Sequence, residues 1–164
     1  MWIADCETEE KIYLSDFMFS SEIRNKNHFG GFTMARYDKF TLKSQEAVQA
    51  AQEIAGKLHH QQIETEHLLA ALLDQTDGVV LPLLKKLGAD PGRLKADLDG
   101  ALERLPRIEG LVQTYLSPRL NKLFERAEQE AQRLKDEYIS TEHLLIAAAN
   151  GDGAGREILT RHGV

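Results

Sequence analysis

The sequence contains the stretch "IETEHLLAALL" at residues 63–73 and the related stretch "ISTEHLLIAAA" at residues 139–149. A shift of 76 residues carries the first onto the second, and the match continues upstream, where Ala51 meets Ala127. After a slip of one residue, "LLKKLGA" meets "ILTRHGV" downstream. The match covers three predicted helices, so it indicates a duplicated supersecondary unit that cannot bury its apolar face alone.

Apolar residues recur at helical spacing from residue 40 onward, and no segment alternates at period two over a useful length. Thr41, Asp90 and Ser117 are predicted helix N-caps, and Gly88 is predicted to end a helix. The sequence therefore predicts an all-α fold, a compact bundle of about seven or eight helices whose two halves are related by a pseudo-twofold axis. The predicted helices cover about 42–58, 65–73, 79–88, 91–105, 118–136, 141–149 and 155–163.

The domain organisation follows from this repeat. We expect a first half at about 40–105, a linker at 106–115 ("PRIEGLVQTY") and a second half at about 116–164, together forming one domain over 34–164. Residues 1–33 have mixed polarity and no sustained period, so we predict a mobile or only locally ordered extension there.

Composition excludes several classes of protein. The net charge of −6 argues against a nucleic-acid-binding surface, which needs clustered basic residues. No apolar run approaches the roughly 20 residues that span a bilayer, and the N-terminus lacks the pattern of a signal peptide. Cys6 is the only cysteine, so an intrachain disulfide is excluded and a reducing, cytoplasmic setting is expected.

The Glu-His pair in each copy raises the alternative of metal or acid–base chemistry, as in a small helical metalloenzyme. Metal ligands on a helix are typically two histidines at i and i+4, whereas His67 and His143 have no second histidine one turn later. We therefore predict that each histidine ring fastens the loop before its helix, and no metal ligands are assigned. Glu66 and Glu142 are interpreted as first-turn residues that favour the helix dipole.

Two amphipathic helices each followed by "I-x-T-EHLL" resemble the Clp repeat domain, the N-terminal domain of Clp AAA+ chaperones. The stretches "DKFTLKSQEAVQAAQEIA" and "ALERLPRIEG" are similar to the ClpB disaggregase branch in particular. The resemblance covers about 35–164 and places the family's usual start near Met34, which favours an upstream start codon or an added segment over a functional arm at 1–33.

The resemblance implies a function for the chain. It implies a non-catalytic, substrate-engaging domain that binds hydrophobic segments of unfolded or aggregated proteins in the stress response. ATP would belong to the parent protein, because this sequence has no G-x-x-x-x-G-K-[ST] phosphate loop. The parent would form a homohexamer that cooperates with the DnaK system, and the isolated domain would be monomeric. The alternative is an adaptor-docking domain of the ClpA or ClpC type, serving a Clp protease.

Five residues are candidates for substrate binding, and none is assigned a catalytic role. The resemblance implies that Thr41, Asp136 and Glu142 are polar residues important for chaperone function or substrate contact. A duplicated bundle can also leave an apolar groove at the seam between its halves, and such grooves bind apolar segments of other chains. We predict that Leu123 and Phe124 line that groove.

Overall fold

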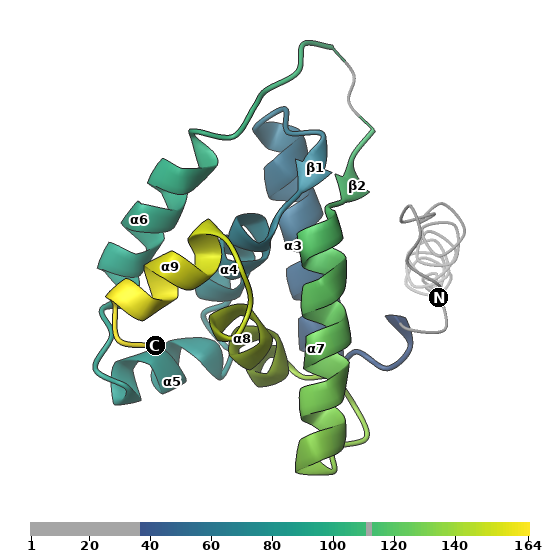
Figure 1. The fold of residues 1–164 in the computed structure, drawn as a ribbon, viewed down its shortest axis with the longest axis vertical. Coiled ribbons are helices and arrows are strands. Elements are labelled where there is room, and N and C mark those ends of the chain that lie inside the picture. Colours follow the sequence, from purple (N-terminus) through teal and green to yellow (C-terminus); the bar gives the residue numbers. More distant parts are fainter. Residues whose placement is uncertain (1–36, 111–112) are drawn as a thin grey trace, which may run out of the picture. The chain divides into compact units, whose positions relative to one another are not determined.

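The computed structural model describes residues 37–110 and 113–164, which all fall in the unit Phe32–Val164. The predicted extension at 1–33 lies outside the described residues. Among those residues, no helix combines the length and apolar character needed to cross a membrane. The described elements are α3 (Leu42–Lys57), β1 (Gln62–Ile63), α4 (Thr65–Asp74), α5 (Val80–Lys86), α6 (Pro91–Leu102), β2 (Tyr115–Leu116), α7 (Pro118–Leu134), α8 (Thr141–Ala149) and α9 (Ala154–Arg161) (Figure 1).

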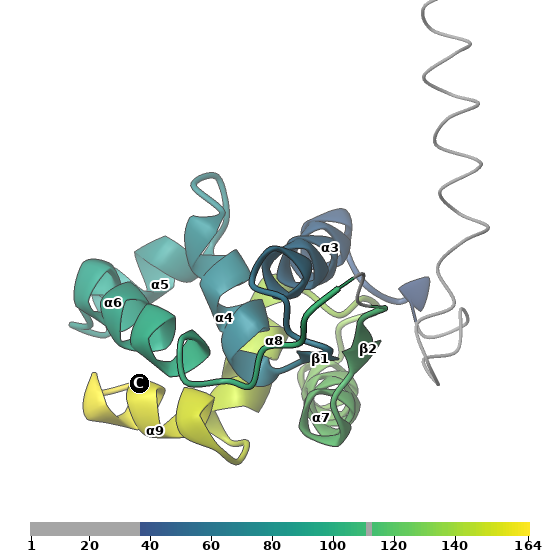
Figure 2. The same cartoon turned by 90° about the horizontal axis from the view of Figure 1, so that it is seen from above.

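The predicted all-α bundle is confirmed. Each half pairs a long first helix with a shorter second one, so that α3 contacts α4 and α7 contacts α8. Figure 2 shows α4 in the middle of the described helices, with α6 and α9 on one side of it and α3 and α7 on the other. All residues of α4 from Thr65 to Leu73 are buried. A helix that is apolar on nearly all sides must be surrounded, and here both halves of the chain surround it.

The two halves exchange short extended segments. Strands β1 and β2 pair in parallel, with Ile63 opposite Leu116. Phe40 forms an isolated parallel bridge with Ile139. Ile139 lies 76 residues after Ile63, and Leu116 lies 76 residues after Phe40, so the same pairing occurs twice. The Ser117 amide donates to the Ile63 carbonyl at 3.1 Å, and the Thr41 amide donates to the Ile139 carbonyl at 3.0 Å. The segment before the second helix of each half therefore pairs with the segment before the first helix of the other.

The predicted helix caps are confirmed. The side-chain oxygens of Thr41, Asp90 and Ser117 each accept a hydrogen bond from a backbone amide two or three residues later, at 3.3, 2.9 and 3.1 Å. These bonds satisfy amides that have no partner within the helix. Gly88 has φ +84°, the left-handed conformation expected after the last residue of a helix.

Several helices end two or three residues before the predicted position. The fourth predicted helix ends at Leu102, so Leu105 lies beyond α6. The fifth ends at Leu134, about two residues early, because Lys135 adopts the left-handed conformation with φ 63°. The sequence also did not predict β1 and β2, since two residues are too few to show a period-two pattern.

Gly155 allows α9 to approach α4 closely. A Cβ added there would lie 3.0 Å from Leu69 Cδ1 and 3.1 Å from Thr65 Cγ2, so these side chains would have to move. By contrast, nothing lies within 4 Å of a Cβ added at Gly100 in α6.

We expect Gly155→Ala to lower the free energy of unfolding by about 1–3 kcal/mol, the usual cost of overpacking a core. The matched change Gly100→Ala should raise it by about 0.5–1 kcal/mol, because alanine favours a helix interior and has open space there. Urea unfolding followed by circular dichroism measures both. Equal effects of the two changes would show that the contact between α4 and α9 is not tight.

Candidate functional site

The histidine of each "TEHLL" motif fastens the loop before its helix. The Glu64 amide donates to Nδ1 of His67 at 2.9 Å, and the Ser140 amide donates to Nδ1 of His143 at 3.0 Å. In an ordinary capping box, a glutamate or glutamine three residues after the N-cap accepts a hydrogen bond from the N-cap amide. Here the histidine ring occupies that position in both halves. The predicted fastening role of both histidines is confirmed.

The second ring nitrogen of these histidines faces different groups in the two halves. Because Nδ1 accepts in both rings, we assign a proton to Nε2 of each. In the first half, His67 Nε2 lies 2.9 Å from Nδ1 of His60, which is also buried. In the second half, His143 Nε2 lies 3.1 Å from Oδ2 of Asp136, close enough for an ion pair but outside hydrogen-bond geometry.

Burial makes the first histidine pair hard to protonate. Desolvation, together with the neighbouring His60, lowers the pKa of His67 to about 4, against a smaller opposing effect of the Glu64 backbone. Desolvation lowers the pKa of His60 too, with Arg107 and His59 adding to the effect. Both rings are therefore neutral near pH 7.

These histidines are poor metal ligands. A neutral imidazole binds a metal through its unprotonated nitrogen, and in His67 and His143 that nitrogen already accepts a backbone amide. Within residues 37–110 and 113–164, no group of three or more His, Cys, Asp or Glu side chains is placed to hold a metal ion.

The two motif glutamates differ sharply. Glu66 is 4% exposed, and its Oε1 accepts the Gly155 amide at 2.9 Å, in the first turn of α9. Gly153 at the N-cap of α9 offers no side chain, so Glu66 from the other half satisfies this helix end. Glu142 is half-buried and, within the described residues, makes no hydrogen bond or ion pair. The sequence interpretation of Glu66 as a residue of its own helix start missed its bond to α9.

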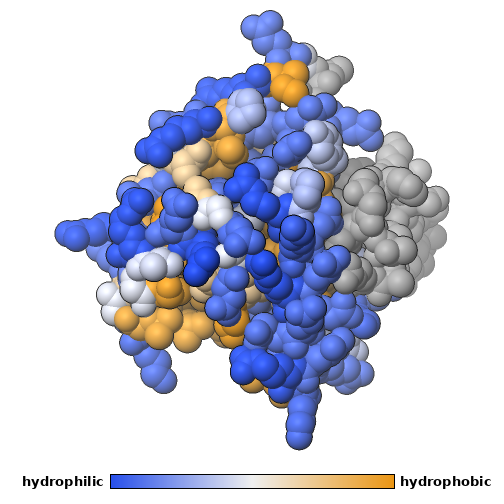
Figure 3. Space-filling model, in the orientation of Figure 1, coloured by the Kyte–Doolittle hydropathy of each residue, from blue (hydrophilic) through white to orange (hydrophobic). Residues whose placement is uncertain are grey.

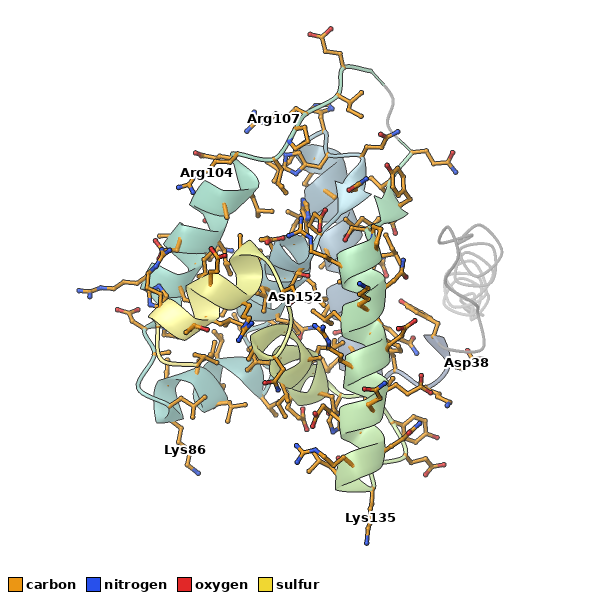
Figure 4. The ribbon with its side chains drawn as sticks, in the orientation of Figure 1. Asp38, Lys86, Arg104, Arg107, Lys135 and Asp152 are labelled. Atoms are coloured by element: carbon orange, nitrogen blue, oxygen red, sulfur yellow. The ribbon has the colours of Figure 1, made fainter. Side chains whose placement is uncertain are left out.

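Thr41, Asp136 and Glu142 lie on the two segments that meet at the Phe40–Ile139 bridge, beside the C-terminal end of α7. Figure 4 labels Lys135 at this end of α7. Three exposed apolar side chains lie next to these polar residues in the sequence, with exposed fractions of 70%, 48% and 51%. We call this set the α7-end surface; it consists of Thr41, Leu42, Leu134, Asp136, Tyr138 and Glu142.

Leu123 and Phe124 are core residues, each 2% exposed. Leu123 lines a small cavity of about 40 Å³. The Phe124 ring meets the ring of Phe40 edge-on, with centroids 5.4 Å apart and an interplanar angle of 88°. Phe124 therefore supports the bridge segment beneath the α7-end surface, and client contact at these two residues stays a prediction.

A concave site lies near the start of α7, at the other end of the helix from the α7-end surface. Its volume is about 340 Å³. Figure 4 labels Arg104 and Arg107 nearby, where the chain leaves α6. Sequence reasoning treated 106–115 only as a linker and missed this site. We call it the linker cavity; it is lined by His60, Gln61, Gln62, Glu64, Leu105, Pro106, Ile108 and Arg119.

The rest of the visible surface is mainly polar. The face in Figure 3 is largely hydrophilic, with an apolar area at the lower left, where Figure 1 places α5. The exposed side chains of Val79 and Leu87 flank that helix. Lys85 and Lys86, in the last turn of α5, precede Leu87.

Comparison with known proteins gives consistent matches. A family model described as the Clp repeat (R) N-terminal domain matches residues 39–162. The chain is 39% identical over 129 residues to Chaperone protein ClpB of Rhodopirellula baltica, covering 79% of this chain and 15% of that protein. The Hsp104 N-terminal domain from Candida albicans has a TM-score of 0.69 at 21% identity, covering 77% of this chain and 83% of that chain. The N-terminal domain of the ClpV1 ATPase from E.coli EAEC has a TM-score of 0.64 at 27% identity, covering 71% of each.

These matches agree with the duplicated architecture. The family match includes both "TEHLL" copies and the segments that the two halves exchange. The chain spans about 15% of the length of the curated relatives. The chain therefore belongs to the Clp repeat (R) N-terminal domain family, and the curated relatives that it matches include ClpB chaperones.

Proposed function

We propose that this chain is the client-engaging N-terminal domain of a ClpB-type ATP-dependent protein disaggregase. It binds exposed hydrophobic segments of unfolded or aggregated proteins weakly and passes them to the ATPase ring. The domain itself is non-catalytic, and ATP binds to other modules of the parent protein. The parent acts in the cytoplasm as a homohexamer together with the DnaK system. The ClpB relatives support this specific role within a family that also includes ClpV ATPases.

The α7-end surface is the observation that carries this proposal. The Glu66 carboxylate already accepts the Gly155 amide, whereas its counterpart Glu142 is accessible and makes no hydrogen bond or ion pair within the described residues. Leu42 and Tyr138 are exposed apolar side chains, and Asp136, two residues before Tyr138, is exposed as well. Apolar side chains rimmed by polar groups are typical of a site that holds apolar segments of many sequences. The asymmetry predicts that the second copy of the motif, and not the first, faces the client.

We expect a permanently unfolded protein, such as reduced and carboxymethylated lactalbumin, to shift amide signals around Asp136 and Glu142 in a saturable way. Tyr138→Asp should weaken this binding about tenfold, since it replaces an aromatic contact by a charge. Glu142→Ala should weaken it about fivefold, the value of one lost polar contact of about 1 kcal/mol. NMR titration of the full chain measures all three.

Glu53→Ala is the matched control, because Glu53 is exposed on α3 and away from the motif. It should leave the affinity unchanged. Shifts spread evenly over the surface, or equal effects of the changes at Glu53 and Glu142, would mean that Glu142 acts only at the start of its helix and does not contact the client.

A further inference from the structure

One helix of the first half has no counterpart among the described residues of the second half. Helices α3, α4 and α5 match α7, α8 and α9, whereas α6 matches none of them. Helix α6 contacts α4 of its own half and α9 of the other half. By the same symmetry, a helix in the matching place would contact α8 and α5. The exposure of α8 and α5 can therefore be compared with that of the two helices that α6 contacts.

Helix α8 is less buried than α4 at matching positions. On α4, Ala70 and Leu73 are buried, with exposed fractions of 2% and 7%. The residues 76 positions later, Ile146 and Ala149, are only partly buried, and they share one side of α8 at a spacing of three. Helices α6 and α9 both contact α4, and α5 contacts α8 as α9 contacts α4. The partial exposure of α8 is thus explained by the lack of a described counterpart of α6.

Helix α5 differs from α9 in the same way. In the repeat, Leu83 and Leu87 match Ile158 and His162. Ile158 is 4% exposed and the side chain of His162 is 15% exposed, whereas Leu87 is 53% exposed and Leu83 is only partly buried. This part of the molecule contains the apolar area at the lower left of Figure 3. We call the set the α5–α8 face; it consists of Leu83, Lys86, Leu87, Ile146 and Ala149.

The charge at the end of α5 indicates what the α5–α8 face accepts. On α9, Arg161 and His162 both lie against Asp97 of α6, at 3.2 and 3.0 Å. Lys86 takes the place of Arg161 on α5; it is exposed and has no ion-pair partner within the described chain. The buried side of α6 consists of Leu94, Leu98 and Leu102. A helix of this kind, with leucines at every fourth position and an acidic residue three after the first, is complementary to the face.

The end of α9 directs the chain as the end of α5 does. Gly88 and Gly163 both adopt the left-handed conformation, with φ +84° and +80°. The amides of Ala89 and Val164 each donate to the carbonyl five residues earlier, at 3.0 Å. After Ala89 the chain enters α6 at Pro91. The geometry that leads the chain from α5 into α6 is thus repeated at the end of α9.

We propose that the α5–α8 face holds an amphipathic helix of the same protein, one that follows Val164 and takes the place of α6 in the second half. Its apolar side packs on Leu83, Leu87 and Ile146, and an acidic side chain near its start pairs with Lys86. The chain spans about 15% of the length of its curated relatives, so this helix belongs to the longer protein. The inference does not rest on client binding, because the occupant is part of the protein itself.

The first test adds a second copy of α6 to the full chain. Residues 90–103, "DPGRLKADLDGALE", are appended directly after Val164. We expect the amide signals of 83–87 and 146–149 to shift, and these amides to exchange with solvent at least about tenfold more slowly, which corresponds to about 1.4 kcal/mol. The same extension with its three leucines replaced by serine should have neither effect. NMR of backbone amides and hydrogen exchange measure both.

A charge reversal then tests the position of the helix on the face. Replacing the aspartate of the copy that corresponds to Asp97 by lysine places two cations together and should reduce the slowing of exchange about threefold, the effect of one exposed ion pair. Lys86→Glu in the same chain should restore it. Lys57→Glu, at an exposed lysine in the last turn of α3, is the matched control and should not restore it.

Leu87→Asp should abolish both effects of the extension without unfolding the chain, because this side chain is 53% exposed. An extension that leaves 83–87 and 146–149 unchanged overturns the inference. The free peptide "DPGRLKADLDGALE" provides the second decisive result. If the peptide bound this face while the attached copy did not, the face would serve a helix of another protein, and the assignment to this protein would be wrong.

Discussion

Glu66→Ala is expected to lower the free energy of unfolding by about 2–3 kcal/mol, whereas Glu142→Ala should lower it by less than about 0.5 kcal/mol. The Glu66 side chain is buried and accepts the Gly155 amide, which has no other cap because Gly153 lacks a side chain. Its loss leaves a buried donor unpaired, at about 1–3 kcal/mol, and adds the cost of the space left behind. Glu142 makes no comparable bond within the described chain.

The two glutamates form a natural matched pair, since they occupy the same position in the repeated motif. Urea unfolding at pH 7 of both alanine variants measures the difference. Glu66→Gln keeps an acceptor oxygen for Gly155 and should recover most of the loss. If Glu66→Gln were as destabilising as Glu66→Ala, packing and not the bond to α9 would explain the effect.

The second large effect is a loss of stability in mild acid. The pKa of His67 is about 4 in the folded chain, against 6.5 for the model group that represents the unfolded chain. Between these values the unfolded state binds a proton that the folded state does not, so stability is complete above pH 6.5 and falls as pH decreases toward 4. We expect a loss of about 2 kcal/mol between pH 7 and pH 5 from His67 alone, at about 1.4 kcal/mol per unit.

His67→Gln tests this source. Glutamine at this position can still accept the Glu64 amide, as in an ordinary capping box, but it does not titrate. The variant is expected to be less stable at pH 7, yet its further loss between pH 7 and pH 5 should be about 2 kcal/mol smaller. Urea unfolding at half-unit pH intervals measures both slopes. Parallel slopes would mean that His67 is protonated equally in both states.

Local chemistry explains why so much of the fold was predictable. The caps at Thr41, Asp90 and Ser117 satisfy amides a few residues away, so their signal lies within a short window of sequence. The 76-residue match likewise predicted paired halves. Helix ends were harder to predict where a residue other than glycine, such as Lys135, adopts a left-handed conformation, because a lysine in the sequence does not indicate that conformation.

The candidate sites were harder to predict because they depend on contacts between distant residues. Nothing near Glu66 in the sequence indicates that it reaches Gly155, 89 residues later. The linker cavity combines His60, Ile108 and Arg119 from three segments that have no common pattern. One available signal was that His60 lies only seven residues before His67; the chain between them forms β1 and the start of α4, and the two ring nitrogens meet at 2.9 Å.

The exchange of extended segments between the halves has a consequence for how the domain originated. The same contact is made twice, once by Ile63 with Leu116 and once by Phe40 with Ile139, with the roles of the two halves exchanged. Reciprocal use of one patch defines the interface of an isologous homodimer. A single ancestral copy would have had unpaired backbone groups on its exchanged segments, which a second identical copy could satisfy. The reciprocal pairing is the pattern that fusion of such a dimer would leave, and in one chain it does not depend on protein concentration.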